Sequence, residues 1–327
     1  MRFKRIDVFR LVAIFIVIWA HAQFFDGVKP EGAFASGLEL TVVIAMRCTM
    51  QFFFIASGYV VGGKIMEAPG ATFGLTWKYL RKLLLVFAGW SFLYALQSPF
   101  KFMQVVREDP EKLFFEGTRI HLWFLVALFL AILLFKLWPF DKKGNSFLLF
   151  GLGLFAVGLL GGSYAITPIG MDLHFNTRNA IFFSVPFFAI GVHLYVKKPS
   201  ITPRAAWGIF LFGLVLFSVE TYILWARWSA LPIRHDYLLG SIPYGTGFFL
   251  IAYAARKKAR LDDILAPYSK YVLGIYASHI LFLDLWAPWG KYFDPISWGF
   301  LLPILVFVSS LLTVMIISKT PLKWMVL

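Results

Sequence analysis

MRFKRIDVFRLVAIFIVIWAHAQFF, residues 1–25, decides the fold of this chain. After three cations it continues with about 20 mostly apolar residues, the length of a transmembrane helix. Two ionisable side chains, Arg10 and His21, lie within it. Eleven residues of helix advance about 16 Å and return to within about 20° of the same face. We therefore expect both side chains on one side of the helix, with Asp7 placed to pair with Arg10 one turn away.

Ionisable groups at membrane depth usually face a cavity or the interior of a helix bundle, and they mark function. The first helix is therefore the leading candidate for a functional element. In the alternative interpretation, Arg10 reaches back to the inner interface together with Arg5, and His21 belongs to the outer boundary of the membrane.

The composition of the 327 residues indicates a polytopic membrane protein. Apolar residues make up 60%, the mean hydropathy is +0.75 and 15% of residues are charged, against about 25% in a soluble domain. The net charge of +14 is explained by Lys and Arg in cytoplasmic loops, so we expect no nucleic-acid partner. The single cysteine, Cys48, excludes an internal disulfide and a cysteine-rich metal site.

Ten apolar spans predict an all-α integral membrane protein with about ten transmembrane helices. The spans are 6–25, 38–63, 80–97, 120–138, 147–163, 179–196, 206–226, 237–255, 270–288 and 296–317. If the N-terminus is cytoplasmic, twenty Lys and Arg side chains lie inside and nine lie outside, which favours two cytoplasmic termini. We expect one domain, 1–327, in the inner (cytoplasmic) membrane of the cell, with the loop 98–119 lying partly along the interface.

The second span carries two candidate functional residues. Arg47 lies near mid-membrane, where a guanidinium needs a charged partner or a bound anion. It is either half of a structural ion pair or a contact for a donor or an oxyanion. Ser57 would need an adjacent base to act as a nucleophile, and the local sequence supplies none. The pair Ser57-Gly58 therefore predicts close helix packing, and Ser57 is kept as a candidate donor contact.

Four polar or aromatic residues are expected at the outer side. His121 and Trp123 open the fourth span, and His174 and Arg178 lie in the loop after the fifth span. Each has an ordinary interpretation as an interfacial or loop residue. Together they are candidates for contact with an acceptor substrate.

The ninth span places Tyr276 and His279 one turn apart, with His279 near mid-membrane. They are either a buried pair that satisfies itself by hydrogen bonding or contacts for the donor or an oxyanion. The sequence has no Walker-type loop, HExxH motif or Cys/His spacing typical of metal sites, so we expect no metal.

Four stretches together resemble acyltransferase family 3, a group of multispan membrane acyltransferases. They are Asp7-x-x-Arg10 followed by ten residues and His21, FFFIASGY in the second span, HLWFL in the fourth and GIYASH in the ninth. The Arg-x10-His element is the most diagnostic of them, and the resemblance covers all ten spans. We expect the extracytoplasmic hydrolase-like domain fused to some members to be absent.

The resemblance implies transfer of an acyl group, commonly acetyl, from cytosolic acyl-coenzyme A to a hydroxyl of an extracytoplasmic glycan or lipid-linked sugar. It implies that Arg10 and His21 are essential. In the mechanism we expect, His21 is the general base and Arg10 positions the donor. Arg47 or His279 steadies the developing oxyanion. A covalent acyl-histidine and longer acyl groups such as succinyl stay open.

Two other classes of protein also fit a membrane protein with buried charges. The first is a polysaccharide exporter or flippase without acyl-transfer chemistry, although the sequence shows no internal repeat of the kind many transporters have. The second is a structural or sensor protein, which would bind no coenzyme A thioester.

Overall fold

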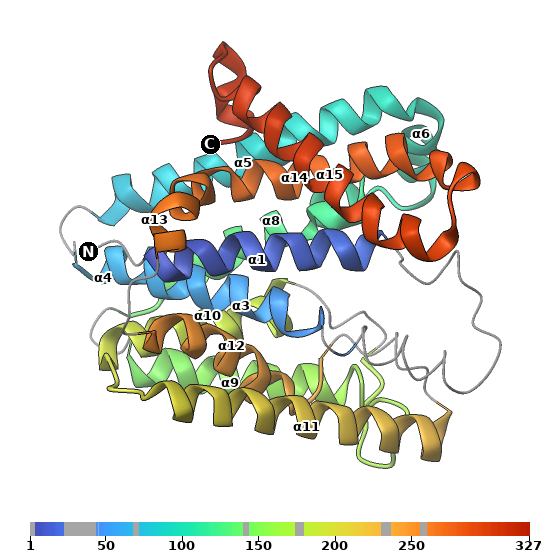
Figure 1. The fold of residues 1–327 in the computed structure, drawn as a ribbon. Coiled ribbons are helices and arrows are strands. Elements are labelled where there is room, and N and C mark those ends of the chain that lie inside the picture. The colour runs from blue at the N-terminus through green and yellow to red at the C-terminus, as the bar shows by residue number, and fades with distance from the viewer. Residues whose placement is uncertain are drawn as a thin grey trace. The chain divides into compact units, whose positions relative to one another are not determined.

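The computed structural model describes most of the chain as helices and turns, with no strand among the residues it describes (Figure 1). The described residues are 4–22, 44, 46–67, 72–139, 144–173, 180–229, 237–255 and 260–327. The all-α prediction is confirmed for these residues. The physical reason is that long apolar runs satisfy their own backbone hydrogen bonds as helices.

The chain folds as two compact units, each assembled from separated segments. The first unit consists of Met1–Ile6, Leu40–Lys78 and Ala127–Ala259. The second consists of Asp7–Glu39, Tyr79–Val126 and Arg260–Leu327. Because neither unit is a continuous stretch, no single cut along the sequence would separate them.

The second unit holds the first helix and the C-terminal helices. Its elements are α1 (Lys4–His21, from Asp7 on), α5 (Thr72–Gln97, from Tyr79 on), α6 (Pro99–Glu108), α7 (Lys112–Phe115), η2 (Ile120–Leu122), the start of α8 (Trp123–Leu137), α13 (Arg260–Leu265), η6 (Ala266–Tyr271), α14 (Val272–Trp286), η7 (Ala287–Tyr292), α15 (Pro295–Ile317) and η8 (Pro321–Met325). Figure 1 shows α14 and α15, in orange to red, beside α5.

Aromatic contacts and buried hydrogen bonds hold these helices together. The rings of Phe15 and Phe307 are 5.7 Å apart, which places α1 against α15. Trp90 on α5 donates to the carbonyl oxygen of Met325 at 3.0 Å, and Tyr94 donates to that of Ala277 on α14 at 2.9 Å. The indole N–H of Trp90 and the hydroxyl of Tyr94 thus have hydrogen-bond acceptors although both side chains are buried among apolar groups.

The first unit is a bundle around two mutually packed helices, α3 and α10. Its elements are α3 (Cys48–Ser57), η1 (Gly58–Gly62), α4 (Gly63–Glu67), the rest of α8, α9 (Asn145–Leu160), η4 (Ala180–Ser184), α10 (Val185–Lys197), α11 (Pro203–Trp228) and α12 (Ser241–Ala254). In Figure 1, α11 and α12 run side by side, while α3 packs on α10 and α12.

Reciprocal glycines allow α3 and α10 to approach closely. A Cβ atom at Gly58 would overlap the carbonyl oxygen of Phe188, and one at Gly191 would overlap that of Ile55. The predicted packing role of Ser57-Gly58 is confirmed, since backbone meets backbone at this point. Gly58 also begins a single π-helical turn, a feature often found where a helix departs from regular packing.

Replacing Gly58 with alanine is expected to destabilise the chain by about 1–3 kcal/mol, the cost of overpacking a close contact. The matched control is Gly153→Ala on α9, where nothing lies within 4 Å of an added Cβ. That change should be neutral or stabilising by up to about 1 kcal/mol, because alanine favours helix over glycine. Thermal unfolding in detergent measures both, and equal midpoints for the two variants would contradict the packing argument.

Five described helical segments are long and apolar enough to cross a membrane. They are Phe73–Gln97, Ile120–Leu137, Pro203–Trp228, Arg260–Tyr292 and Ser297–Ile317. Asn145–Leu160 and Ile181–Lys197 are apolar but shorter. Helix α1 carries four charged residues in its 18 positions, all among its first seven, and is not one of these segments. The ten crossings and the cytoplasmic termini stay predictions.

The predicted amphipathic connection after the third span is helical. It forms α6 and α7, on which Phe100, Phe114 and Phe115 are exposed. Exposed aromatic rings beside charged residues are typical of a helix lying in the membrane interface, and that location stays a prediction.

Candidate active site

Helix α1 carries both residues of the Arg-x10-His element on one continuous helix. It begins at Lys4 and ends at His21, so the axial separation of about 16 Å between Arg10 and His21 follows from the helical rise. The predicted ion pair between Asp7 and Arg10, one turn apart, is confirmed, because Arg10 Nη1 lies 3.5 Å from Asp7 Oδ1. The side chain of Arg10 is partly exposed, and His21 is exposed at the end of the helix.

His21 meets a second histidine from α14, within the same unit. Its Nδ1 lies 3.4 Å from Nε2 of His279, and the two ring centroids are 5.0 Å apart. His279 is 0% exposed. The sequence singled out both residues, but their contact joins positions 258 residues apart and could not be inferred from spacing.

Neighbouring carbonyl groups determine where the protons of these two rings lie. His279 Nδ1 is 2.5 Å from the carbonyl oxygen of Tyr276, and His21 Nδ1 is 3.0 Å from that of Val17. A carbonyl oxygen only accepts, so we assign a proton to Nδ1 of each ring. Neutral His279 then presents the lone pair of Nε2 to the N–H of His21. Neutral His21 has its own lone pair on Nε2.

His121 extends this cluster, hereafter the histidine cluster of His21, His121 and His279. Its ring centroid is 5.0 Å from that of His279, and its Nε2 is 3.3 Å from the carbonyl oxygen of Ala277. The sequence suggested a position at the outer boundary of the membrane, and in the structure the side chain is 3% exposed. The short turn Ile120–Leu122 before α8 turns it inward, so any acceptor role would have to be exercised from a buried position.

The rings of Tyr276 and His279 are in contact, with centroids 5.7 Å apart, but the hydrogen bonds they donate go to backbone oxygens. The hydroxyl of Tyr276 donates to the carbonyl oxygen of His121, while the bond from His279 goes to the backbone oxygen of Tyr276. Tyr276 therefore joins α14 to the turn that holds His121. Trp123, the first residue of α8, is partly buried in the same unit.

A charged pair that sequence analysis missed lies beside the cluster. Arg119 Nη2 is 2.6 Å from Asp284 Oδ2, and Gln97 Nε2 donates to the same oxygen at 3.2 Å. The guanidinium lies over the ring of Tyr94, 5.6 Å from its centroid. The sequence offered one signal for this pair. Arg119 is two residues before His121, and Asp284 is five residues after His279, so both charges lie close to candidate site residues.

The sequence profile of acyltransferase family 3, described as an acyltransferase domain, matches residues 3–319. The chain belongs to this family. The resemblance based on four short stretches is thereby confirmed over nearly the whole sequence, and membership supports an acyltransferase activity in a membrane protein.

Two similar proteins are named as racemases and not as acyltransferases. A serine/alanine racemase of Enterococcus gallinarum is 27% identical over 260 residues, covering 74% of this chain and 36% of the racemase. An amino-acid racemase of Enterococcus faecalis is 25% identical over 256 residues, covering 73% of this chain and 36% of that protein. The aligned part is thus about a third of each relative's length. No solved structure matches this chain.

The remaining site residues predicted from the sequence lie on other segments of the chain. Arg47 immediately precedes α3 and Ser57 ends it, and both belong to the first unit. Their roles toward the donor or an oxyanion stay predictions. His174 and Arg178 lie outside the described residues. Among the residues the structure describes, no group of three potential ligands is placed to hold a metal ion.

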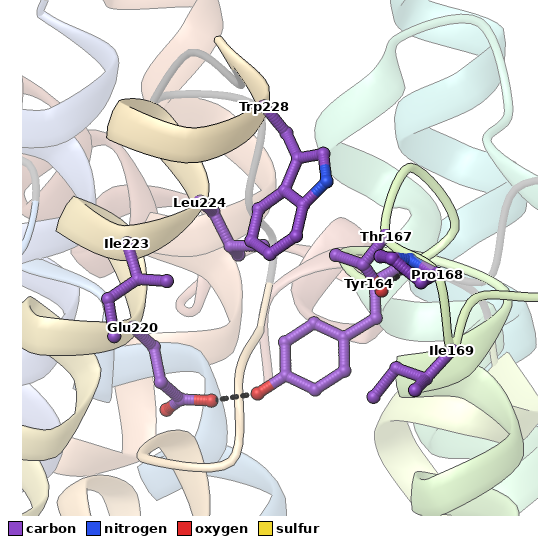
Figure 2. A pocket seen from close by; sticks show the side chains of 8 residues that line it. All are labelled: Tyr164, Thr167, Pro168, Ile169, Glu220, Ile223, Leu224 and Trp228. Atoms are coloured by element: carbon purple, nitrogen blue, oxygen red, sulfur yellow. Dashed lines mark hydrogen bonds between the residues drawn. The ribbon is translucent and has the colours of Figure 1, made fainter.

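A cavity of about 390 Å³ lies within the first unit, at the end of α11. Figure 2 shows its lining residues, which are Tyr164, Thr167, Pro168, Ile169, Glu220, Ile223, Leu224 and Trp228. Most of these present apolar atoms. The one carboxylate, Glu220, points toward Tyr164 across the floor of the view and accepts its hydroxyl hydrogen bond.

Glu220 is a structural clamp. Oε1 also accepts from the backbone N–H of Leu239 at 3.0 Å, and Oε2 accepts from that of Gly240 at 2.7 Å. Burial, followed by the bond to Glu220, raises the pKa of Tyr164, so its hydroxyl stays protonated and donates. Both oxygens are thus engaged by the protein, which leaves this carboxylate poorly suited to act as a base. The signal for it in the sequence was a lone acid within the apolar span 206–226.

Replacing Glu220 with alanine should lower the stability of the chain, since it removes the acceptor for two backbone N–H groups. A buried donor left without a partner costs about 1–3 kcal/mol. Glu220→Gln keeps one carbonyl oxygen and should lose less, and Glu111→Ala at an exposed position should change nothing. The thermal midpoint in detergent is the measurement. A Glu220→Ala midpoint equal to that of Glu111→Ala would contradict the clamp.

Proposed function

We propose that this protein is an O-acyltransferase of the cell's inner membrane. In this proposal it moves an acyl group, acetyl in the first instance, from cytosolic acyl-coenzyme A to a hydroxyl of an extracytoplasmic glycan or lipid-linked sugar. Family membership supports acyl transfer. The observation that carries the proposal is the contact between Nδ1 of His21 and Nε2 of His279.

This contact suits general-base catalysis by His21. With its proton on Nδ1, His21 offers the basic Nε2 to a substrate hydroxyl. Nε2 of His279 accepts the hydrogen bond from Nδ1–H of His21. Nδ1–H of His279 in turn donates to the carbonyl oxygen of Tyr276. The arrangement sets the tautomer and the orientation of the base, which are the two properties that a buried partner supplies in other histidine-dependent enzymes.

The proposed reaction balances in two steps. As His21 Nε2 takes the hydroxyl proton, the sugar oxygen bonds to the thioester carbonyl carbon. The carbon–sulfur bond then breaks, and the imidazolium returns its proton to the departing coenzyme A thiolate. Arg10 is proposed to hold the donor by its charge, and Arg47 is proposed to stabilise the oxyanion. In a variant of this scheme, Nε2 itself attacks the thioester carbon, the carbon–sulfur bond breaks to release coenzyme A, and the acyl group then passes from the histidine to the sugar hydroxyl.

The test uses purified protein in liposomes with acetyl-labelled coenzyme A thioester and a panel of glycans. Label on a glycan together with stoichiometric release of free coenzyme A is the expected result. His21→Ala reports contaminating activity, and His193→Ala, which removes a histidine from α10 in the first unit, is the matched control. Label retained on the protein before a glycan is added would identify the covalent variant.

Other outcomes overturn the proposal. If glycans cross the membrane unmodified and His21→Ala stops their passage, the protein is an exporter. If neither acetyl nor longer acyl thioesters are consumed with any glycan, acyl transfer from coenzyme A is excluded as the activity.

A further inference from the structure

The ion pair beside the histidine cluster has the properties of a ligand-binding subsite. Arg119 and Asp284, with side chains 22% and 38% exposed, are joined through a single pair of atoms, Nη2 and Oδ2. Gln97 adds a second bond to the same Oδ2. In the described part of the chain, Oδ1 of Asp284 and the remaining N–H groups of Arg119 have no hydrogen-bond partner.

The ion pair of Arg119 and Asp284 is expected to add little to the stability of the fold. A partly exposed ion pair contributes about 0–1 kcal/mol. Arg119 lies in the turn just before η2, and this turn is already joined to α14 because Tyr276 donates to the carbonyl of His121. The pair is therefore available to bind a ligand without being needed to hold this turn to α14.

The position of the pair relates it to the proposed reaction centre. Asp284 lies five residues beyond His279 on α14, about 7.5 Å along the helix axis. The rings of Tyr94 and His121 are 5.5 Å apart, so a continuous series of contacts runs from Arg119 through Tyr94 and His121 to His279. An oligosaccharide with one hydroxyl at His21 can thus be proposed to place a second sugar at Arg119.

The unused groups match a particular chemistry. Arg119 offers N–H donors and Asp284 offers an acceptor oxygen, and a sugar hydroxyl both donates and accepts. The two charges cancel, so the pair has no net charge to attract an anion, and a carboxylate would meet the negative charge of Asp284. Vicinal hydroxyl groups of an uncharged sugar fit both members of the pair.

We propose that Arg119, Asp284 and Gln97 form the acceptor subsite and select a neutral, polyhydroxylated sugar over an anionic one. This inference rests on the proposed function for its place in the reaction. It can still be tested by binding alone, which separates its failure from failure of the acyl-transfer proposal.

The experiment measures the affinity of purified protein, without donor, for neutral oligosaccharides and for their uronic-acid counterparts. Wild type should prefer the neutral series. Asp284→Asn should weaken neutral binding by about tenfold, the loss of one hydrogen bond to a charged group. It should also strengthen uronate binding, because Arg119 is then left without its counter-charge. Gln97→Leu, which leaves the ion pair intact, should weaken neutral binding by a smaller factor.

The matched control is Asp109→Asn in another exposed ion pair of the same unit, where Lys112 Nζ lies 2.5 Å from Asp109 Oδ2. It should leave both affinities unchanged. An unchanged neutral-to-uronate ratio in Asp284→Asn overturns the proposal, as does an equal effect of Asp109→Asn. Where acyl transfer is observed, the same Asp284 variant should raise the KM for the acceptor and leave the KM for the thioester unchanged.

Discussion

Replacing His21 with alanine is expected to lower the rate of acyl transfer by about 10²–10⁴-fold, the contribution of a positioned general base. The fold should be retained, because His21 is the exposed last residue of α1 and its truncation creates no cavity. The measurement is the initial rate of label transfer to the glycan at saturating thioester.

Two further variants give this result its meaning. His21→Gln can still donate an N–H group toward Val17 and His279 but has no basic nitrogen, so it should be as inactive as His21→Ala. His193→Ala should keep the wild-type rate and thermal midpoint. A His21→Ala rate within about threefold of wild type would remove His21 from the chemistry, since no base contributes so little.

Replacing His279 with leucine is expected to lower kcat by about 100-fold, the scale of effect seen when a reacting group loses its orientation. Leucine fills the buried position but offers no acceptor to the N–H of His21, which is then held by the carbonyl of Val17 without its second acceptor. The KM for the thioester should stay the same, because His279 is fully buried and does not reach the donor in the proposed scheme.

His279→Gln distinguishes this positioning role from simple packing. Its amide oxygen can accept from His21 and its amide N–H can donate to the carbonyl of Tyr276, so part of the lost rate should return. Thermal midpoints of the two variants control for stability. Equal rates for leucine and glutamine would show that hydrogen bonding by His279 is irrelevant to the reaction.

Relations within one helix were predictable because helical geometry alone determines them. The ion pair of Asp7 with Arg10 and the alignment of Arg10 with His21 follow from the rise and rotation of α1. The all-α class was also predictable for the described residues, since long apolar runs leave a membrane chain few other ways to satisfy its backbone. The close backbone approach at Gly58 was likewise readable from a small residue in an apolar span.

Relations between helices were decided only by the tertiary structure. Nothing in the sequence brought His279 to His21, turned His121 inward, joined Arg119 to Asp284, or bound Glu220 to the N–H groups of Leu239 and Gly240. The spans are apolar on nearly every face, so their patterns do not say which face meets a neighbour. Close fit and a few interhelical hydrogen bonds make that choice, and these depend on side-chain shapes from segments up to 258 residues apart. Local sequence thus determined which chemical groups the membrane helices carry, and packing determined which of those groups can act together.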